Sequence, residues 1–359
     1  MKKILCIILL IINLIAAAAL ILSTLAGTVE PSRMTVISIL SYGYFIFLLA
    51  NVVFIIIWLF LSRWEFLVSV AAIAVRFSFV PLFFQVGGTL DVEPEDNTLK
   101  ILTLNTHSFK GLDDDTLMTA DSGALMFLEL LDREQPDVMC LQEFFRPRHV
   151  SLVDSIEARG YQYHYGVHGS NTRSQAILFS RCKMLKGYDM DRKSKFYADI
   201  EKNGHTVRVC CVHLDSYQLN EDDLESFENL SHAKTDSTTH RLMKKFAETT
   251  RQHEREWKEE LKPLVEECTV PLIIAGDFND TPASYIYQQA TDLLSDPYVE
   301  QGRGFGTTYH GPYPAFRIDY ILHSHDLEAL SYKRIPSAIS DHYPIVVTLR
   351  MNVDKQEAE

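Results

Sequence analysis

The stretch Leu272-Ile273-Ile274-Ala275-Gly276-Asp277-Phe278-Asn279 decides the fold class of this chain. Four consecutive apolar residues are typical of a strand buried on both faces. An acidic and an amide side chain follow this strand, at Asp277 and Asn279. Ser340-Asp341-His342 stands just before another apolar run, at residues 345–347. Because strands hold their flanking side chains rigidly, polar groups at these ends predict a catalytic site.

Short β-rich apolar runs recur downstream of residue 98, separated by polar stretches. The runs cover residues 99–104, 138–141, 161–167, 176–180, 206–213, 272–275, 318–322 and 345–349. Helical patterns lie between them, at residues 122–134, 150–159, 238–267 and 283–294. Strands mixed with helices predict a layered sandwich of the α/β (α+β) class over residues 98–352, followed by a tail at 353–359.

The first 88 residues form a transmembrane region in our interpretation, joined to the rest by a linker at residues 89–97. Three apolar stretches, at about 4–26, 34–61 and 66–85, reach the roughly 20 residues that a membrane-spanning helix needs. Arg76 lies in the middle of the third stretch, at an insertion cost of about 2.5 to 3.5 kcal/mol. Two spans remain the alternative to three, and a cleaved signal peptide is a weaker alternative for the first stretch.

Charge predicts the orientation of these helices. Lys2, Lys3 and Arg63 mark the cytoplasmic side, because basic residues are enriched in cytoplasmic loops. Three spans then place everything after Gly88 outside, on the periplasmic or extracellular side, whereas two spans would leave it inside. We expect the outer side. The first 86 residues carry a net +3, from five basic and two acidic side chains, which leaves −16 on the rest of the chain.

A surface this acidic disfavours tight binding of long polyanions, because nucleic-acid binders usually present a basic face. The six cysteines have no spacing typical of a zinc site. The cysteines in apolar runs are most simply interpreted as buried free thiols. Disulfides remain the alternative if the domain is exported. The sequence predicts no protein partner.

Seven polar residues at or near strand ends form the candidate site: Asn105, Glu143, His213, Asp277, Asn279, Asp319 and His342. Each alone has an ordinary explanation as a turn, a cap or a solvated side chain. Together, carboxylates, amides and imidazoles at strand ends suit a hard divalent cation and a water molecule activated against a phosphoester.

The motifs in which these residues stand resemble the endonuclease/exonuclease/phosphatase superfamily of metal-dependent phosphoesterases. The resemblance covers residues 98–351 and rests on six motifs in the order of that family: Leu104-Asn105, Leu141-Gln142-Glu143, Val212-His213-Leu214, Gly276-Asp277-Phe278-Asn279, Arg317-Ile318-Asp319-Tyr320 and Ser340-Asp341-His342. It implies a four-layer sandwich, with two central sheets packed face to face, helices outside them and the site at one rim.

The resemblance also implies roles for these positions. Glu143 would be the main ligand of Mg²⁺ or Mn²⁺, with Asn105 on the metal or the phosphate and Asp341 as a second metal-side carboxylate. Asp277 would activate the attacking water, and Asn279 would donate its amide to a phosphoryl oxygen. His342, held by Asp319, would bind the phosphate, and His213 would assist the leaving group, as in the deoxyribonuclease and sphingomyelinase branches.

Four further residues are candidate substrate contacts: His107, Arg251, Tyr309 and Arg317. His107 stands where apurinic endonucleases have an acidic residue, so the sequence departs from that branch. A solvent-facing charge is the stronger interpretation of Arg251. Packing or turn roles are equally good explanations of Tyr309 and Arg317.

These observations predict a membrane-tethered, metal-dependent phosphoesterase that hydrolyses a phosphodiester or phosphomonoester by in-line attack of water. Its substrate would be a lipid, a nucleotide or nucleic acid, or a small molecule. One alternative is a non-specific or structure-specific DNA endonuclease. The alternative from another class is an inert binding or scaffold module on the same fold, which would show gaps in the catalytic set.

Overall fold

The computed structural model describes residues 2–93, 95–110, 120–144, 150–166, 176–190, 194–218, 236–311 and 316–351. The expected tail at 353–359 lies outside the described residues. The chain forms two compact units that are interleaved along the sequence. The N-terminal unit comprises Met1–Phe83, Ser216–Lys258 and Asp280–Asp292, and the sheet unit comprises Phe84–Asp215, Glu259–Asn279 and Leu293–Glu359.

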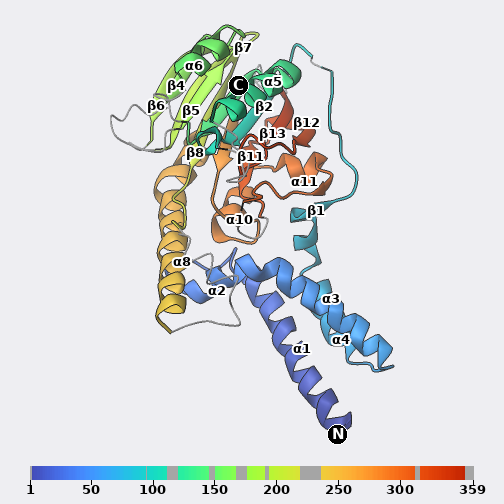
Figure 1. Ribbon diagram of the computed structural model, residues 1–359. Coiled ribbons are helices and arrows are strands. Elements are labelled where there is room, and N and C mark those ends of the chain that lie inside the picture. The colour runs from blue at the N-terminus through green and yellow to red at the C-terminus, as the bar shows by residue number, and fades with distance from the viewer. Residues whose placement is uncertain are drawn as a thin grey trace. The chain divides into compact units, whose positions relative to one another are not determined.

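The sheet unit contains two large mixed sheets (Figure 1). The six-stranded sheet has the order β12 (Leu327–Arg334), β13 (Ile345–Met351), β2 (Thr98–Asn105), β3 (Val138–Gln142), β5 (Ile177–Ser180), β4 (Tyr163–Gly166). The five-stranded sheet has the order β11 (Asp319–His323), β9 (Leu272–Asp277), β8 (His205–His213), β7 (Phe196–Lys202), β6 (Lys183–Asp189). A small ribbon pairs β1 (Phe84–Gln85) with β10 (Gly304–Phe305).

The main core lies between the two large sheets. Leu99 and Ile101 of β2 belong to the same buried cluster as Val209 of β8 and Ile273 of β9. Successive side chains of a strand point to opposite faces. The alternate residues of β2 therefore join a second cluster, in which Leu102 and Leu104 pack with helices α5 (Ala120–Glu134) and α6 (Val150–Glu157). Two mixed sheets flanked by helices confirm the predicted α/β fold class.

The cysteines contribute to this core as thiols. Cys140 and Cys211 are fully buried in the cluster between the sheets. All six cysteines fall within the described ranges, and each is free. Burial raises the pKa of the Cys210 thiol well above its usual range, so this side chain is an apolar packing group.

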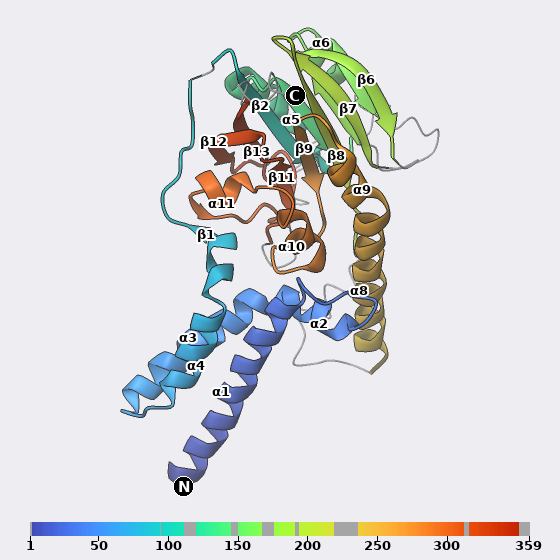
Figure 2. The same ribbon diagram turned by 180° about the vertical axis from the view of Figure 1, so that it is seen from behind.

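The N-terminal unit consists of helices. It includes α1 (Lys2–Leu25), α2 (Thr35–Leu40), α3 (Tyr44–Phe60), α4 (Phe66–Val75), α8 (Asp236–Glu256) and α10 (Tyr285–Thr291). A 3₁₀ turn, Ser41–Gly43, joins α2 to α3. Within this unit, α2 lies beside α8 in both views (Figures 1 and 2). A π-helical turn, Trp257–Leu261, follows α8 and leads into α9 (Lys262–Glu267), and the short helix α11 is Pro297–Gln301.

Two of the helical segments are long and apolar enough to cross a membrane, Lys3–Leu25 and Thr35–Phe60. The third apolar stretch differs from the continuous helix that we expected over residues 66–85. Helix α4 ends at Val75, Arg76 follows as its C-cap, and a 3₁₀ segment, Phe77–Leu82, completes the stretch. Pro81 lies in this segment, and a proline cannot donate the backbone hydrogen bond that an α-helix requires.

Buried polar side chains connect the apolar helices to each other. Asn13 of α1 donates from Nδ2 to Ser69 Oγ of α4 at 2.6 Å, and its Oδ1 accepts from Trp58 Nε1 of α3 at 2.9 Å. All three residues are fully buried. Most of the remaining surface of α1 and α3 is apolar and exposed, including Ile4, Ile15 and Ile46.

Candidate active site

The candidate residues meet because their strands end at the same edge. β2 runs parallel to β3, and β8 runs parallel to β9, so the carboxyl ends of each pair lie together. In the second pair, His213 is directly opposite Asp277. β11 is antiparallel to β9 and begins at this edge, which places Asp319 opposite Asp277 on the other side. Pairing therefore brings His213 and Asp319, which are 106 positions apart, to either side of Asp277.

Asn105 connects the two sheets at the site. Its Nδ2 donates to Glu143 Oε1 at 3.1 Å and to Asp277 Oδ2 at 2.9 Å. Its Oδ1 accepts from the backbone N–H of His107 at 3.0 Å. Asn105 is 2% exposed and both of its amide atoms are engaged, so this side chain braces the two carboxylates.

Asp277 is the most deeply placed carboxylate of the site, with 1% of its surface exposed. Burial, followed by repulsion from Asp319, raises its pKa to about 6, while His342, His213 and Asn105 act in the opposite direction. A carboxylate with a pKa close to neutrality is well matched to accept a proton from water. Asn279 donates its backbone N–H to Asp277 Oδ1 at 2.8 Å and so fixes the carboxylate plane.

Asp319 and His342 form a buried pair. His342 Nδ1 lies 2.9 Å from Asp319 Oδ2, and His342 Nε2 lies 3.9 Å from Asp277 Oδ2. Burial opposes protonation of His342, but Asp319, followed by Asp277 and Asp341, outweighs it and raises the pKa of this imidazole to about 10. At neutral pH, His342 is therefore a cationic donor that faces the same space as Asp277.

His213 approaches the site from β8. Its Nε2 lies 3.7 Å from Glu143 Oε1 and 3.8 Å from Asp277 Oδ2, between the two carboxylates. The side chain is 9% exposed. This position lets the imidazole exchange a proton with a group bound between Glu143 and Asp277.

The backbone at this edge adopts conformations that most residues avoid. Glu143, Asn279 and His107 have positive φ values of 53°, 50° and 41°. Strained φ values of this kind persist only where the surroundings hold them, and they gather at active sites. Gly276 has φ of +149°, and a Cβ there would lie 1.9 Å from the Val212 carbonyl oxygen, so only glycine allows β9 to approach β8 before Asp277.

The comparison with protein families agrees with this geometry. A family model described as the endonuclease/exonuclease/phosphatase family matches residues 102–342, from the middle of β2 to His342. This chain belongs to that family. A second model, described as a domain of unknown function, matches residues 3–83. No curated protein matches the chain.

Solved structures share the fold of this endonuclease/exonuclease/phosphatase protein. A family member from Bacteroides vulgatus is 18% identical, with a TM-score of 0.51, over 71% of this chain and 99% of the other. The human Nocturnin catalytic domain is 16% identical, with a TM-score of 0.51, over 72% and 96%. A mannosyl-6-phosphatase from Bacteroides thetaiotaomicron is 16% identical, with a TM-score of 0.50, over 70% and 99%. The family consists of hydrolases of ester bonds, and this chain is an enzyme of that class.

The donor set fits the divalent cation that the family generally uses. Glu143 keeps 31% of its side chain exposed and offers a hard carboxylate oxygen. Asp341 offers a second carboxylate, which accepts from His107 at 3.2 Å in this structure. Burial opposes ionisation of Asp341, but His107 and His342 lower the pKa of this carboxyl below its usual value. Asp341 is therefore favoured in its anionic form, the form in which a carboxylate binds Mg²⁺.

Asp277, Asp319 and His342 form a second candidate group, whose ligand atoms lie within 4.8 Å of one another. His342 already uses Nδ1 on Asp319, so only Nε2 of its imidazole is left for a further partner.

The four candidate substrate contacts fall into different surroundings. His107 is half-exposed and pairs with Asp341, whose carboxylate raises the pKa of this imidazole. The Tyr309 ring packs edge-on against His342, with ring centres 5.1 Å apart. These two residues border the site.

Arg317 and Arg251 are engaged in other ways. Arg317 is buried, forms an ion pair with Asp296 and lies over the Tyr298 ring at 4.2 Å, so its contacts indicate a structural role. Arg251 belongs to the N-terminal unit, where it donates to Thr35 Oγ1 at 2.8 and 3.1 Å.

Two hydroxyl groups outside the predicted set of site residues support the site. Ser340 Oγ donates to the Asn105 carbonyl at 2.7 Å and accepts from the His342 N–H at 3.2 Å. Thr308 Oγ1 accepts the backbone N–H groups of Ile318 and Asp319, both at 3.1 Å. Ser340 lies inside a motif that the sequence highlights, whereas no local pattern distinguishes Thr308 from an ordinary loop residue.

Proposed function

We propose that this chain is a membrane-tethered phosphoesterase that requires Mg²⁺ or Mn²⁺ and hydrolyses its substrate by in-line attack of water. The observation that carries this proposal is the position of Asp277. A buried carboxylate with a pKa of about 6 lies within 4 Å of Asn105, His213 and His342 at one edge of the sheets. Such a group has the geometry and the pKa of a general base.

Each side chain has one task in this mechanism. Glu143 and Asp341 would hold the cation, which neutralises phosphoryl charge when bound. Asp277 accepts the proton of the attacking water. The His342 imidazolium donates to a phosphoryl oxygen and stabilises the negative charge of the transition state. Asp319 keeps Nδ1 of that imidazole occupied, so that Nε2 faces the substrate.

The remaining two residues complete the reaction. His213 lies between Glu143 and Asp277 and donates a proton to the departing oxygen. Asn279 Nδ2 donates one hydrogen to the Leu214 carbonyl at 2.9 Å, and its second hydrogen serves a phosphoryl oxygen. Each step of the proposed mechanism has a residue of suitable chemistry, which argues against an inert scaffold.

Membrane tethering rests on the apolar surface of the N-terminal helices. Only 17% and 22% of an apolar 18-residue window in each of the two long segments is buried, whereas the core helix of a globular domain is mostly buried. Helix α4 and the 3₁₀ segment after it cover Phe66–Leu82, and at 1.5 and 2.0 Å per residue they extend about 27 Å, close to the ~30 Å of a hydrocarbon core. With three crossings, and with Lys2, Lys3 and Arg63 inside, the active site would lie on the non-cytoplasmic side.

The substrate class follows from charge and tethering. The chain beyond residue 86 carries −16, which disfavours long polyanions such as DNA. A membrane anchor instead keeps the enzyme close to lipid phosphoesters and to small phosphoesters outside the cell. One structural neighbour is a mannosyl-6-phosphatase, which supports a small phosphoester as one substrate class for this fold.

The test is hydrolysis by the purified full-length chain in detergent, with Mg²⁺ or Mn²⁺. The panel contains a bis-aryl phosphate, sphingomyelin, phosphoinositides, sugar phosphates and plasmid DNA. Asp277→Asn should lower turnover by about 10²- to 10⁴-fold, the usual range for loss of a general base. Asp132→Asn is the matched control, because this partly exposed carboxylate pairs only with surface Arg159 in the described structure. Equal turnover by wild type and Asp277→Asn would refute the proposal.

A further inference from the structure

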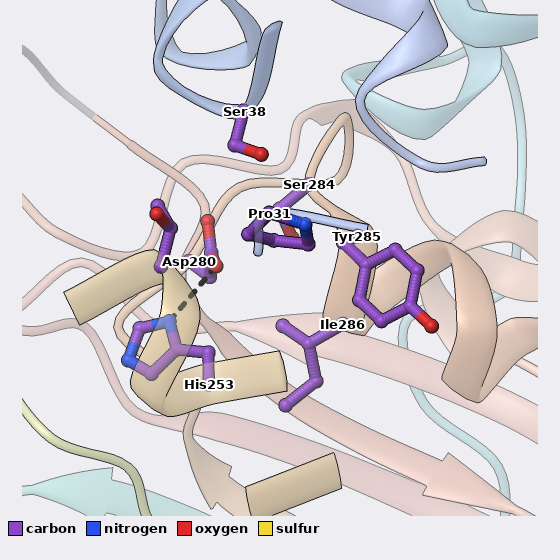
Figure 3. A pocket seen from close by; sticks show the side chains of 8 residues that line it. Pro31, Ser38, His253, Asp280, Ser284, Tyr285 and Ile286 are labelled. Carbon is purple, nitrogen blue, oxygen red and sulfur yellow. Dashed lines mark hydrogen bonds and ion pairs between the residues drawn. The ribbon is translucent and has the colours of Figure 1, made fainter. Parts of the chain in front are cut away.

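Asp280, which directly follows Asn279 in the chain, belongs to the N-terminal unit. It is 3% exposed, and its carboxylate accepts the following hydrogen bonds. Tyr42 donates from its hydroxyl to Oδ1, and the Thr281 N–H donates to the same oxygen at 3.0 Å. His253 Nδ1 lies 2.9 Å from Oδ2, as Figure 3 shows. A carboxylate only accepts, so His253 carries its hydrogen on Nδ1.

The donors come from distant parts of the sequence. Tyr42 lies in the 3₁₀ turn that joins α2 to α3, and His253 lies in α8. The Tyr42 ring packs edge-on against Tyr217 and Phe246, with ring centres 5.4 and 5.3 Å apart. This packing fixes the direction of the Tyr42 hydroxyl toward Asp280.

Additional contacts hold the same region of the N-terminal unit in place. A Cβ at Gly27 would lie 2.3 Å from Gln288 Cγ, so the loop after α1 packs directly on α10. Ser32 donates from its backbone N–H and its hydroxyl to Glu254 of α8, at 2.7 and 2.9 Å. The cavity beside Asp280 measures only about 10 Å³, at the lower limit of what a single water occupies. Close packing of this kind transmits a displacement instead of absorbing it.

This anchor bears on catalysis because of the residue before it. Asn279 has the strained φ of 50° and donates its N–H to Asp277 Oδ1. A conformation of this kind persists only when the chain on both sides is held. Asp277 and the β8–β9 pairing hold the preceding side, and Asp280 holds the following side.

We propose that Tyr42 and His253 are positioning residues for the Asp277–Asn279 turn. By holding Asp280, they keep Asn279 in its strained conformation and Asp277 in the orientation that accepts a proton. This inference rests on the proposed role of Asp277, but the anchoring of the turn is measurable without any substrate.

The test uses the full-length chain in detergent and the Tyr42→Phe variant, which keeps the aromatic packing and loses the hydroxyl. Tyr165→Phe is the matched control, because Tyr165 also donates to an aspartate, Asp189, at 3.0 Å, and that pair plays no part in the site. Hydrogen exchange is followed in peptides that cover residues 277–281. With the bis-aryl phosphate as the probe, kcat and KM are measured separately.

Tyr42→Phe should speed exchange of this segment at least about tenfold and lower kcat about tenfold or more, since small misplacements of catalytic groups have effects of this size. KM should stay within about twofold, and Tyr165→Phe should change neither quantity. His253→Ala should behave like Tyr42→Phe, whereas His253→Asn, whose amide nitrogen replaces Nδ1, should retain wild-type kcat. If Tyr42→Phe fails to fold, the comparison of His253→Ala with His253→Asn tests the inference instead.

Three outcomes would overturn the inference. Unchanged exchange in Tyr42→Phe and His253→Ala would show that the contact does not anchor the turn. Faster exchange with unchanged kcat would show that the contact is structural only. Equal loss in His253→Asn and His253→Ala would show that the hydrogen bond is not what matters. Failure of the proposed function would appear differently, as an inactive wild type whose exchange still responds to Tyr42→Phe.

Discussion

Replacing Asp319 with asparagine tests the role of His342 most closely. The pKa of His342 rises from 6.5 to about 10, which corresponds to about 5 kcal/mol of preference for the imidazolium. Asp319 supplies the largest favourable part, through its charge and the 2.9 Å hydrogen bond, and Asp277 and Asp341 supply the rest. We therefore expect Asp319→Asn to lose ~3 kcal/mol of this preference, which lowers kcat by up to about 100-fold at alkaline pH, where the variant's imidazole is neutral and the wild type's is still protonated.

The pH dependence of kcat gives the sign of this effect. His342 acts as the protonated form, so its contribution is complete below its pKa and disappears as the pH rises through it. In the wild type this loss falls near pH 10. Without the Asp319 charge the pKa drops, and the alkaline limb of the profile moves to lower pH. A stopped assay with a bis-aryl phosphate from pH 5 to 10, with unfolding midpoints as the check on folding, measures both effects. A variant with kcat within threefold of wild type and an unmoved alkaline limb would refute this reasoning.

Three further predictions concern the metal, an ion pair and a backbone constraint. Glu143→Gln should abolish the rise in unfolding temperature that Mg²⁺ or Mn²⁺ gives the wild type, as calorimetry would detect. Burial opposes ionisation of Glu134, but Lys333 outweighs burial and lowers the pKa of this carboxyl. The stability that Glu134 contributes is therefore complete above its pKa in the unfolded chain and is lost as the pH falls through its pKa in the folded chain. Glu134→Gln should make the unfolding midpoint depend less on pH between pH 3 and 6. Gly276→Ala should destabilise the fold by at least about 2 kcal/mol in denaturant titration, whereas Gly204→Ala, which meets no atom within 4 Å, should cost about 1 kcal/mol.

The sequence was most informative where strands are buried on both faces. All six residues of β9 are buried, and Asp277 stands at its end, so an apolar run followed by an acid revealed both the strand and the site. The same reasoning located β2, β3, β8 and β13. Fold class and site were therefore accessible from local patterns, because burial on both faces demands an uninterrupted apolar run.

Besides the two-residue strands β1 and β10, three longer strands of the described structure escaped this reasoning. β6 is an edge strand with mostly exposed or half-exposed residues, and β7 alternates buried with half-buried positions. β12 includes Glu328 and Lys333 on its accessible side. Since these strands bury only one face or lie at an edge, no continuous apolar run marks them.

The interleaving of the two units was also beyond local sequence patterns. Nothing near Tyr42 or His253 indicates that both meet Asp280, because Tyr42 is 238 positions and His253 is 27 positions away from it in the sequence. Arg317 shows a second limit of local patterns. Because it is a charged residue in a site motif, it was a candidate substrate contact, but tertiary packing pairs it with Asp296.

The central claim is that Asp277 and its neighbours activate water against a phosphoester. Turnover of a bis-aryl phosphate in ¹⁸O-labelled water, with Mn²⁺ and the full-length chain, tests it directly. Our account predicts that the label appears on phosphorus and that Asp277→Asn loses about 10²- to 10⁴-fold in rate. Label in the released alcohol, or no turnover of any panel ester by a folded, metal-binding wild type, would contradict it.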